Sequence, residues 1–424
     1  MNPKLARKIT TRLAESGQPP ERGVSEFNVG TEELLRTLKD EYLTTILAED
    51  GGSTFKLVEA QYGGGKTHFL RCLQDIAWQQ NFAVSLVELD QHECPYDNPL
   101  LVYKAVVRNI SAPPAAEDED SEPGLQPFLQ NLIYTRREQF EKSRDPAAEQ
   151  QRWLDSFRAA DIESTVFREA LYAALSGHLH DDREIFDLLT GWILGENPPL
   201  QRLRKAIGIG ERIDKSNSFM MLRSLCQAVR ALDFSGLLIL FDEGYRMVSL
   251  MSAKKQMEAC ENLVSIINYC GHAKLPGAMF AYAVPPNFRS DIVPRYEALR
   301  QRLEMTTPFS RSSPMSPVID LEGLTLEPEE LLLAIGEKLL PIIATARKHE
   351  YDAEIQRENI KSLAHEAVEK ALDVNSRRIF VKALANLLIS QAVDGETRLS
   401  PPQVEAHVRK TNESLQGASG GDEF

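Results

Sequence analysis

The sequence predicts an α/β protein with a mostly parallel sheet, a long helical insertion and a small all-helical domain after the last strand. Three observations predict this class. A glycine-rich segment joins a short apolar run to an amphipathic one, which is the pattern of strand, loop and helix. A second apolar run ends in two adjacent carboxylates. After residue 324 the hydrophobic spacing is helical and no further strand is predicted.

Length and composition limit the class of protein. With 424 residues the chain exceeds what one core usually supports, so we expect a large domain and a smaller one. The formal net charge of -14 argues against a dedicated, high-affinity nucleic-acid binder, although local basic patches are compatible with it. The five cysteines are scattered without metal-ligand spacing and are expected to be reduced thiols. No signal peptide or membrane span is predicted, so we expect a cytoplasmic protein.

The N-terminal third begins with an extension, residues 1–30, in which a helix leads into a turn-rich connector. The large α/β core is expected over residues 31–324. Within it, residues 31–47 predict an amphipathic helix and residues 55–60 the first strand. The glycine-rich loop follows, and residues 66–79 return to helical spacing.

The second strand is expected at residues 82–89, followed by a helix over residues 99–110. The acidic, Pro- and Ala-rich stretch 112–124 predicts a flexible linker, because it has little apolar surface to bury. From residue 125 to about 232 nearly every segment has helical spacing. We therefore expect a helical insertion between the second and third strands.

Three further strands complete a five-stranded, mostly parallel sheet. Residues 325–413 predict four helices, which would form an α-helical lid, and residues 414–424 predict a disordered tail rich in Gly and Ser. The remaining strands are expected at residues 237–241, 278–284 and 318–321, with a helix over residues 257–269 between the first two of them.

The glycine-rich loop has almost the pattern GxxxxGK[ST], with Ala60 in place of the first glycine. In such loops backbone N–H groups surround the β-phosphate, the Lys bridges β- and γ-phosphate oxygens and the hydroxyl binds Mg²⁺. A Gly-rich turn without a ligand is the alternative, but the position between a strand and a helix favours ATP. His68 follows the loop and is expected to pack or hydrogen-bond locally rather than to catalyse a step. The predicted ATP-binding residues are Ala60, Gln61, Tyr62, Gly63, Gly64, Gly65, Lys66, Thr67 and His68, with Thr67 also a metal ligand.

The carboxylates Asp242 and Glu243 follow the third predicted strand, at the edge where ligands of open α/β sheets bind. Asp242 would hold Mg²⁺ through water, Glu243 would polarise the attacking water, and Lys66 would stabilise the transferred phosphoryl group. A helix N-cap carboxylate is the alternative, which the nearby loop disfavours. Adjacent acids at this strand are typical of AAA+, STAND and RecA-like ATPases. The predicted helical lid favours AAA+ and STAND proteins over RecA-like ones. The predicted fold is therefore a P-loop NTPase of the AAA+ or ASCE kind.

Less specific signals predict further catalytic residues. Asn287 follows the fourth strand and is our candidate for sensing the γ-phosphate, although Val284-Pro285-Pro286 precedes it. Arg295, Arg300 and Arg302 lie where an oligomeric ATPase commonly presents an arginine finger to its neighbour. A solvated helix face with salt bridges is an equally compatible interpretation of these arginines.

Two arginines of the lid are candidates for contact with the nucleotide. Arg377 and Arg378 open a helix whose following residues are apolar at helical spacing. From that position either guanidinium could reach back to the phosphates. A solvent-exposed arginine at a helix start is the alternative.

These motifs together resemble the ATP-binding proteins of BREX phage-defence systems, of the BrxC/BrxD type. The resemblance covers most of the chain apart from the middle helices, and it includes segments 27–30, 59–70, 237–243, 299–303 and 319–324. It implies an AAA+ ATPase that acts with helicase, nuclease or methyltransferase partners against foreign DNA. Such proteins usually have a Gly-Thr-Pro-like turn where this chain has Val-Pro-Pro, which leaves the γ-phosphate sensor open.

Two functions follow as hypotheses. The first is an ATPase that drives or gates a DNA-processing anti-phage complex, with hydrolysis between subunits. The second is a STAND-like switch or scaffold, in which bound ATP controls assembly and turnover is slow. An origin-recognition-like DNA loader fits less well, because too few residues follow the lid for a winged helix. We expect ATP and Mg²⁺ as cofactors, a homo-oligomer, a helicase or other defence-system partner, DNA bound directly or through that partner, and no membrane.

Overall fold

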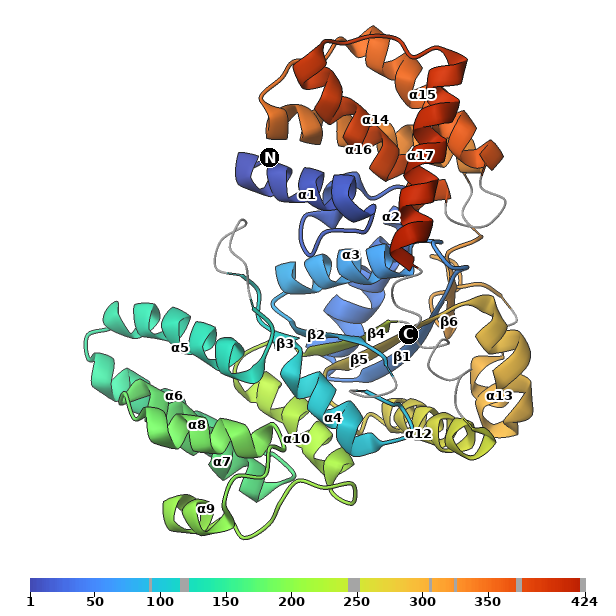
Figure 1. The fold of residues 1–424 in the computed structure, drawn as a ribbon. Helices are drawn as coiled ribbons and strands as arrows, with labels where there is room; N and C mark the ends of the chain where they lie inside the picture. The colour runs from blue at the N-terminus through green and yellow to red at the C-terminus, as the bar shows by residue number, and fades with distance from the viewer. Residues whose placement is uncertain are drawn as a thin grey trace.

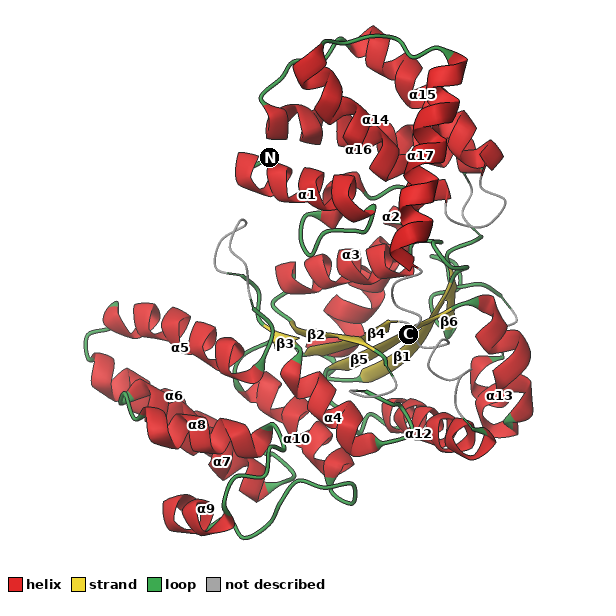
Figure 2. Cartoon of the chain, in the orientation of Figure 1, coloured by secondary structure: helices red, strands yellow, loops and turns green. Residues whose placement is uncertain are grey.

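A central sheet lies between two helical layers. The computed structural model describes residues 1–90, 94–114, 122–242, 252–304, 307–323, 326–370 and 376–419, except for the side chains of residues 416–419. Figure 1 shows the sheet in the middle, the insertion helices on one face, and α3 (Lys66–Gln79) with the N-terminal and C-terminal helices on the other. Figure 2 shows that strands make up only this central layer and that helices supply most of the remaining chain.

Among the described residues the sheet has six strands, in the order β3-β2-β4-β5-β1-β6. All neighbouring pairs are parallel except β2 and β3. The predicted parallel sheet is therefore present, and β5 lies between β1 and β4. The strands are β1 (Ser53–Glu59), β2 (Ala83–Glu88), β3 (Ile110–Ser111), β4 (Leu237–Asp242), β5 (Ala278–Val284) and β6 (Val318–Asp320).

The sixth strand corrects the expectation of five. The helix expected over residues 99–110 is α4 (Pro99–Arg108), and the two residues of β3 pair antiparallel with β2. The Ser111 hydroxyl also donates to the Val84 carbonyl at 2.9 Å. Without β3, β2 would be the edge strand of the sheet. The exposed N–H and C=O groups of such an edge readily pair with another segment of the chain, which explains why β3 forms.

The strands are apolar on both faces because helices cover both sides. In β4, Leu237, Ile239 and Phe241 face one hydrophobic cluster, while Leu238 and Leu240 face the other. Alternate side chains of a strand point to opposite faces, so a strand buried on both sides has a continuous hydrophobic run. This explains why β4 was predictable from five consecutive apolar residues.

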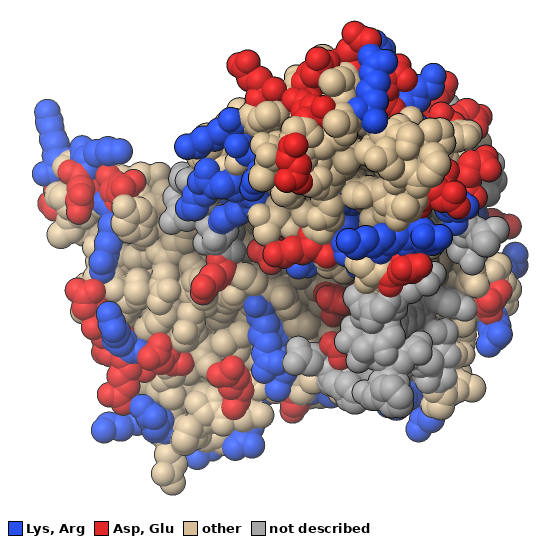
Figure 3. Space-filling view, turned by 45° about the horizontal axis from the view of Figure 1, so that its top comes forward, with Lys and Arg blue, Asp and Glu red and all other residues tan. Residues whose placement is uncertain are grey.

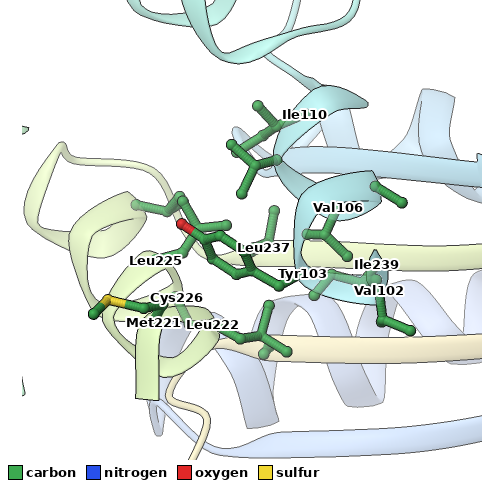
Figure 4. Close-up of a cluster of buried hydrophobic side chains, with 14 of the residues drawn as sticks. Val102, Tyr103, Val106, Ile110, Met221, Leu222, Leu225, Cys226, Leu237 and Ile239 are labelled. Carbon is green, nitrogen blue, oxygen red and sulfur yellow. The ribbon is translucent and has the colours of Figure 1, made fainter. Parts of the chain in front are cut away.

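The first face is covered by α4, α10 (Ser218–Ala231) and α12 (Ala253–Gly271). Figure 4 shows side chains of α4 and α10 packed against Leu237 and Ile239 of β4. The Tyr103 hydroxyl donates to the Ile193 carbonyl at 2.7 Å, which ties the insertion to this layer. The other insertion helices are α5 (Leu125–Glu141), α6 (Pro146–Arg158), α7 (Thr165–Leu179), α8 (Arg183–Ile193) and α9 (Leu200–Ile207).

The second face is covered by α3 (Lys66–Gln79), and the C-terminal helices lie beyond it. The N-terminal helix α1 (Pro3–Ser16) packs against α14 and α16, so the first and last parts of the chain form one helical unit. Its C-terminal helices are α14 (Pro328–Arg347), α15 (Ala353–Lys370), α16 (Ser376–Asp394) and α17 (Pro401–Ser419).

Several element bounds differ from the expected ones. The helix expected over residues 31–47 consists of α2 (Glu32–Thr37) and a π-helix, η2 (Leu38–Glu49). Helix α17 continues to Ser419, beyond the expected start of the tail at residue 414, and Leu415 is buried there. Residues 115–121 of the expected linker lie outside the described residues. No helix among the described residues is long and apolar enough to cross a bilayer.

Candidate nucleotide-binding site

The loop between β1 and α3 needs its glycines. Gly63 and Gly65 have φ angles of 78° and 91°, a region that residues with a side chain rarely adopt. A Cβ atom on Gly64 would lie 2.6 Å from the Glu322 Oε1 and 2.9 Å from the Ala60 Cβ. The methyl group of Ala60 is itself fully buried, so the loop accommodates alanine at its first position.

The Lys66 side chain is held inside this loop. Its ammonium donates to the carbonyls of Ala60 at 3.0 Å and Gln61 at 2.9 Å, and only 7% of the residue is exposed. The ammonium also lies 5.7 Å from the centre of the Tyr62 ring. A cation fixed beside the N-terminus of α3 makes this concave loop suited to an anion, because the free N–H groups of a helix start favour negative charge.

The loop and the acidic strand end meet at one point. The Thr67 hydroxyl donates to the Asp242 Oδ2 at 2.5 Å, although 175 positions separate the two residues. Parallel order brings this about, because the carboxyl ends of β1 and β4 lie at the same edge of the sheet with β5 between them. The expected convergence of Thr67 and Asp242 is therefore present. Glu243 lies outside the described residues.

Two side chains hold the outer surface of the loop. The Arg377 guanidinium, at the start of α16, donates to the Gly64 carbonyl. The Glu322 carboxylate, just after β6, accepts from the Gln61 N–H at 2.7 Å. Burial lowers the pKa of the Arg377 guanidinium, and the Glu322 carboxylate partly offsets this. The lid and the end of β6 thus both contact the loop directly.

A cavity of about 230 Å³ lies between the loop, the N-terminal segment and the lid. Arg378 lines it too, but its Nε donates to the Ser16 carbonyl at 3.0 Å, toward α1. The wall next to the loop is polar, whereas apolar side chains form much of the rest. A cavity with a glycine loop suited to an anion at one end and apolar walls at the other could accommodate a nucleotide. Its other lining residues include Leu13, Phe27, Asn28, Val29, Thr31, Leu321, Leu331 and Ile335.

His68 lines the cavity, and its ring centre lies 5.0 Å from that of Phe27. Burial lowers the pKa of His68 to about 4, and the Arg377 guanidinium adds to the effect. The ring is therefore neutral at pH 7, in keeping with a packing role.

We expect an NMR titration of the histidine rings, with His68→Phe to assign the signal, to show His68 protonating near pH 4. Because the ordinary pKa of histidine is about 6.5, the unfolded chain takes up this proton first. The free energy of unfolding should therefore fall as the pH drops from about 6.5 toward 4. A His68 titration at or above pH 6.5 would contradict this account.

The expected γ-phosphate sensor does not line the cavity. Asn287 is exposed, because the chain turns helical directly after β5 and leads into the π-helix η3 (Phe288–Ile292). Instead, Arg289 reaches back to the end of β1, where its guanidinium donates to both carboxylate oxygens of Glu59 at 2.7 and 3.0 Å. Only 4% of Glu59 is exposed, so this ion pair fixes the start of the glycine loop to η3.

The three candidate finger arginines have different surroundings. Arg300 donates to the Glu297 carboxylate at 2.9 and 2.8 Å, within α13 (Glu297–Leu303). Arg302 donates to the Asn268 Oδ1 at 2.7 Å. Arg295, in η4 (Val293–Arg295), is exposed and makes no ion pair with any residue that the structure describes. None of the three lines the cavity.

The sequence assigned no site role to Glu322, which contacts the glycine loop, or to Leu331 and Ile335, which line the cavity. For Glu322 a signal existed, because a carboxylate at the end of a parallel strand follows the same logic as Asp242. For Leu331 and Ile335 there was none, since their helical spacing predicts only a buried face. Phe27 and Asn28 were singled out only as part of segment 27–30 of the family resemblance.

Comparison with known proteins identifies the family. The family model for the BREX system ATP-binding proteins BrxC/D matches residues 1–402. The chain belongs to this family. Searches of curated proteins and of solved structures gave no match. For this BrxC/D family member, the family description agrees with the local geometry, because a nucleotide triphosphate is the ligand that a glycine loop with Lys66, Thr67 and Asp242 suits.

Proposed function

We propose that this BrxC/D family member binds Mg-ATP in the described cavity and hydrolyses it, as a P-loop ATPase of the AAA+ kind. The observation that carries the proposal is the contact between the Thr67 hydroxyl and the Asp242 carboxylate at 2.5 Å. These are the two groups that P-loop ATPases place at the metal of Mg-ATP.

The residues fit a magnesium ion. Mg²⁺ is commonly bound through one or two carboxylates, water and the phosphates of its substrate rather than by a cage of protein ligands. Asp242 and Thr67 supply a carboxylate and a hydroxyl beside the glycine loop. When bound, the ion would neutralise charge that develops on the phosphate oxygens.

The remaining roles follow from position. Lys66 would contact the β- and γ-phosphates, and the N–H groups at the start of α3 would surround them. Glu243, the residue after Asp242, would accept a proton from the attacking water. Arg377 contacts the Gly64 carbonyl, so it would couple nucleotide binding at the loop to the position of the lid. Arg378 contacts the Ser16 carbonyl, so it would couple the lid to α1.

Within a BREX system, we propose that this ATPase drives or gates a DNA-processing defence complex. The helical lid after β6 supports the AAA+ assignment over a RecA-like one. A STAND-like switch with slow turnover is the second candidate. The contacts of Arg300 and Arg302 with their own chain favour that switch. Arg295 is exposed and forms no ion pair with a described residue, which favours hydrolysis between subunits.

The test of Mg-ATP binding uses Asp242→Asn. Calorimetric titration should show that this variant binds Mg-ATP about 10- to 100-fold more weakly than the wild type. With excess EDTA, the wild type and the variant should bind ATP with equal affinity, because the substitution removes only the contribution of Mg²⁺ to the affinity. The exposed Asp291→Asn variant is a matched control and should behave as wild type. Equal loss in Asp242→Asn with and without Mg²⁺ would argue against a metal-linked role.

Arg295 is our choice for a finger that completes the site of a second copy. Arg295→Ala should lower turnover about 100-fold, because one transition-state donor is removed. Mixing it with Lys66→Ala should restore activity, since some interfaces then combine an intact Lys66 with an intact Arg295. Arg300→Ala should be near wild type. No recovery on mixing, at concentrations where the protein is oligomeric, would favour the switch.

A further inference from the structure

The outward face of α1 is strongly basic in an acidic protein. Lys4, Arg7, Lys8 and Arg12 follow helical spacing on one side, whereas Leu5, Ile9 and Leu13 are buried on the other. Arg7 and Arg12 are both exposed. With Glu15 as the single carboxylate, this helix carries a net charge of 4 − 1 = +3 within a chain of net charge -14. Figure 3 shows Lys and Arg side chains gathered over the N-terminal half of this helix.

The chemistry of this face favours a regular polyanion. From Lys4 to Arg12 the helix rises about 12 Å, a span that several successive phosphates of one duplex strand occupy. An amphipathic helix that binds a membrane uses its apolar side, but that side of α1 is packed against α14 and α16. Met1 is exposed just before the helix, and no residue of α1 itself adds a large exposed apolar side chain that could anchor an acidic peptide. We infer that the basic face of α1 binds the phosphate backbone of duplex DNA, without reading its bases.

The same helix reaches the nucleotide cavity. Leu13 and Gly17, at its C-terminal end, line that cavity together with Arg378. The Arg378 Nε donates to the Ser16 carbonyl at 3.0 Å, and the Asn386 amide donates to the Ala14 carbonyl at 2.9 Å. Gly17 has φ 63°, and a Cβ atom there would lie 2.7 Å from the Arg378 carbonyl, so α1 and the lid are tightly joined.

DNA bound to α1 and nucleotide bound at the cavity therefore act on one helical unit. Each ligand changes the affinity for the other, and by the same factor. This coupling rests on the proposed ATP site, whereas the contact of α1 with DNA does not. The two parts can accordingly fail separately.

The experiment measures fluorescence anisotropy of a labelled 30-base-pair duplex of mixed sequence with the full chain, from 50 to 300 mM NaCl. The variant Arg7→Glu/Arg12→Glu should bind at least about 10-fold more weakly. The slope of log affinity against log salt should fall by about two, for two lost phosphate contacts. Circular dichroism should show unchanged unfolding, because both side chains are exposed.

The matched control is Arg204→Glu/Lys205→Glu on α9, which makes the same change in net charge at two exposed residues. It should bind the duplex within about twofold of wild type. Equal losses in both variants would assign the effect to net charge alone and overturn the proposal, as would wild-type binding by the α1 variant. Binding to vesicles with phosphatidylserine that depends on Arg7 and Arg12, without duplex binding, would overturn it in favour of a membrane surface.

The coupling has its own readout. Mg-ATP should change the duplex affinity of the wild type at least about fivefold. It should leave Lys66→Ala unaffected, while that variant binds duplex normally without nucleotide. If the wild type binds duplex but not Mg-ATP, the ATP proposal fails and the α1 contact stands. Binding of both ligands without mutual effect would overturn the coupling.

Discussion

Replacing Lys66 with alanine is expected to abolish ATP binding at micromolar nucleotide, with affinity reduced on the order of 10³-fold. The physical reason is that a charged donor held in a buried, concave loop is lost, and removing one partner of such a charge-assisted contact costs about 2–5 kcal/mol. The Lys66 ammonium is already oriented by the Ala60 and Gln61 carbonyls, so the wild-type site needs little ordering. Fluorescence titration with a labelled ATP analogue measures the loss.

Two controls separate binding from folding in Lys66→Ala. Thermal unfolding should stay cooperative, because Lys66 itself lines the cavity and Gln61, one of its two carbonyl partners, is an exposed residue. Lys255→Ala, which removes an exposed lysine from α12, should bind ATP as the wild type does. Retained ATP affinity in a folded Lys66→Ala protein would remove the glycine loop from the proposed site.

The sequence was sufficient where local pattern determines structure. Strand β4 and the loop at Gly63 to Thr67 were predictable because an apolar run buried on both faces and a set of glycines next to Lys66 each have few alternative structures. The contact between Thr67 and Asp242 followed from one topological rule, that parallel strands end at the same edge. No contact information was required for either conclusion.

Features that depend on tertiary packing were not predictable. The cavity wall formed by Phe27 and Asn28 exists because η1 (Val24–Phe27) lies on α3 and α1 packs on the lid. Nothing in the N-terminal sequence specifies that arrangement. The two residues of β3 depend on the open edge of β2, and the ion pair between Arg289 and Glu59 joins elements 230 positions apart.

Asn287 illustrates how the order of residues can mislead. A polar residue just after the central strand would sit at the active edge if the strand ended in an extended turn. Here Pro285 and Pro286 intervene, and proline at a helix start favours the helical conformation that follows. The helical turn leaves Asn287 exposed and brings Arg289 back to Glu59. A role of Asn287 at the γ-phosphate therefore stays a prediction that would require movement of η3.

Changing Glu243 to glutamine is expected to leave Mg-ATP affinity within about threefold of wild type and to lower turnover on the order of 10³–10⁴-fold. The amide keeps the shape of the carboxylate but accepts no proton from water, and a positioned general base contributes about 10²–10⁴-fold. Only an interaction that strengthens in the transition state lowers kcat without changing ground-state binding. Phosphate release under single-turnover conditions measures the effect.

The expected position of Glu243 follows from its neighbour. Asp242 ends β4 at the Thr67 hydroxyl, which is where it would hold the magnesium ion through water. The next residue of the chain is then the nearest remaining carboxylate in sequence for the attacking water. Glu261→Gln, at an exposed residue of α12, controls for the loss of one charge and should turn over ATP normally. Turnover in Glu243→Gln equal to that of the wild type would sink the assignment of the base. If both proteins also turn over slowly, the switch is the better description, because bound nucleotide then persists in both.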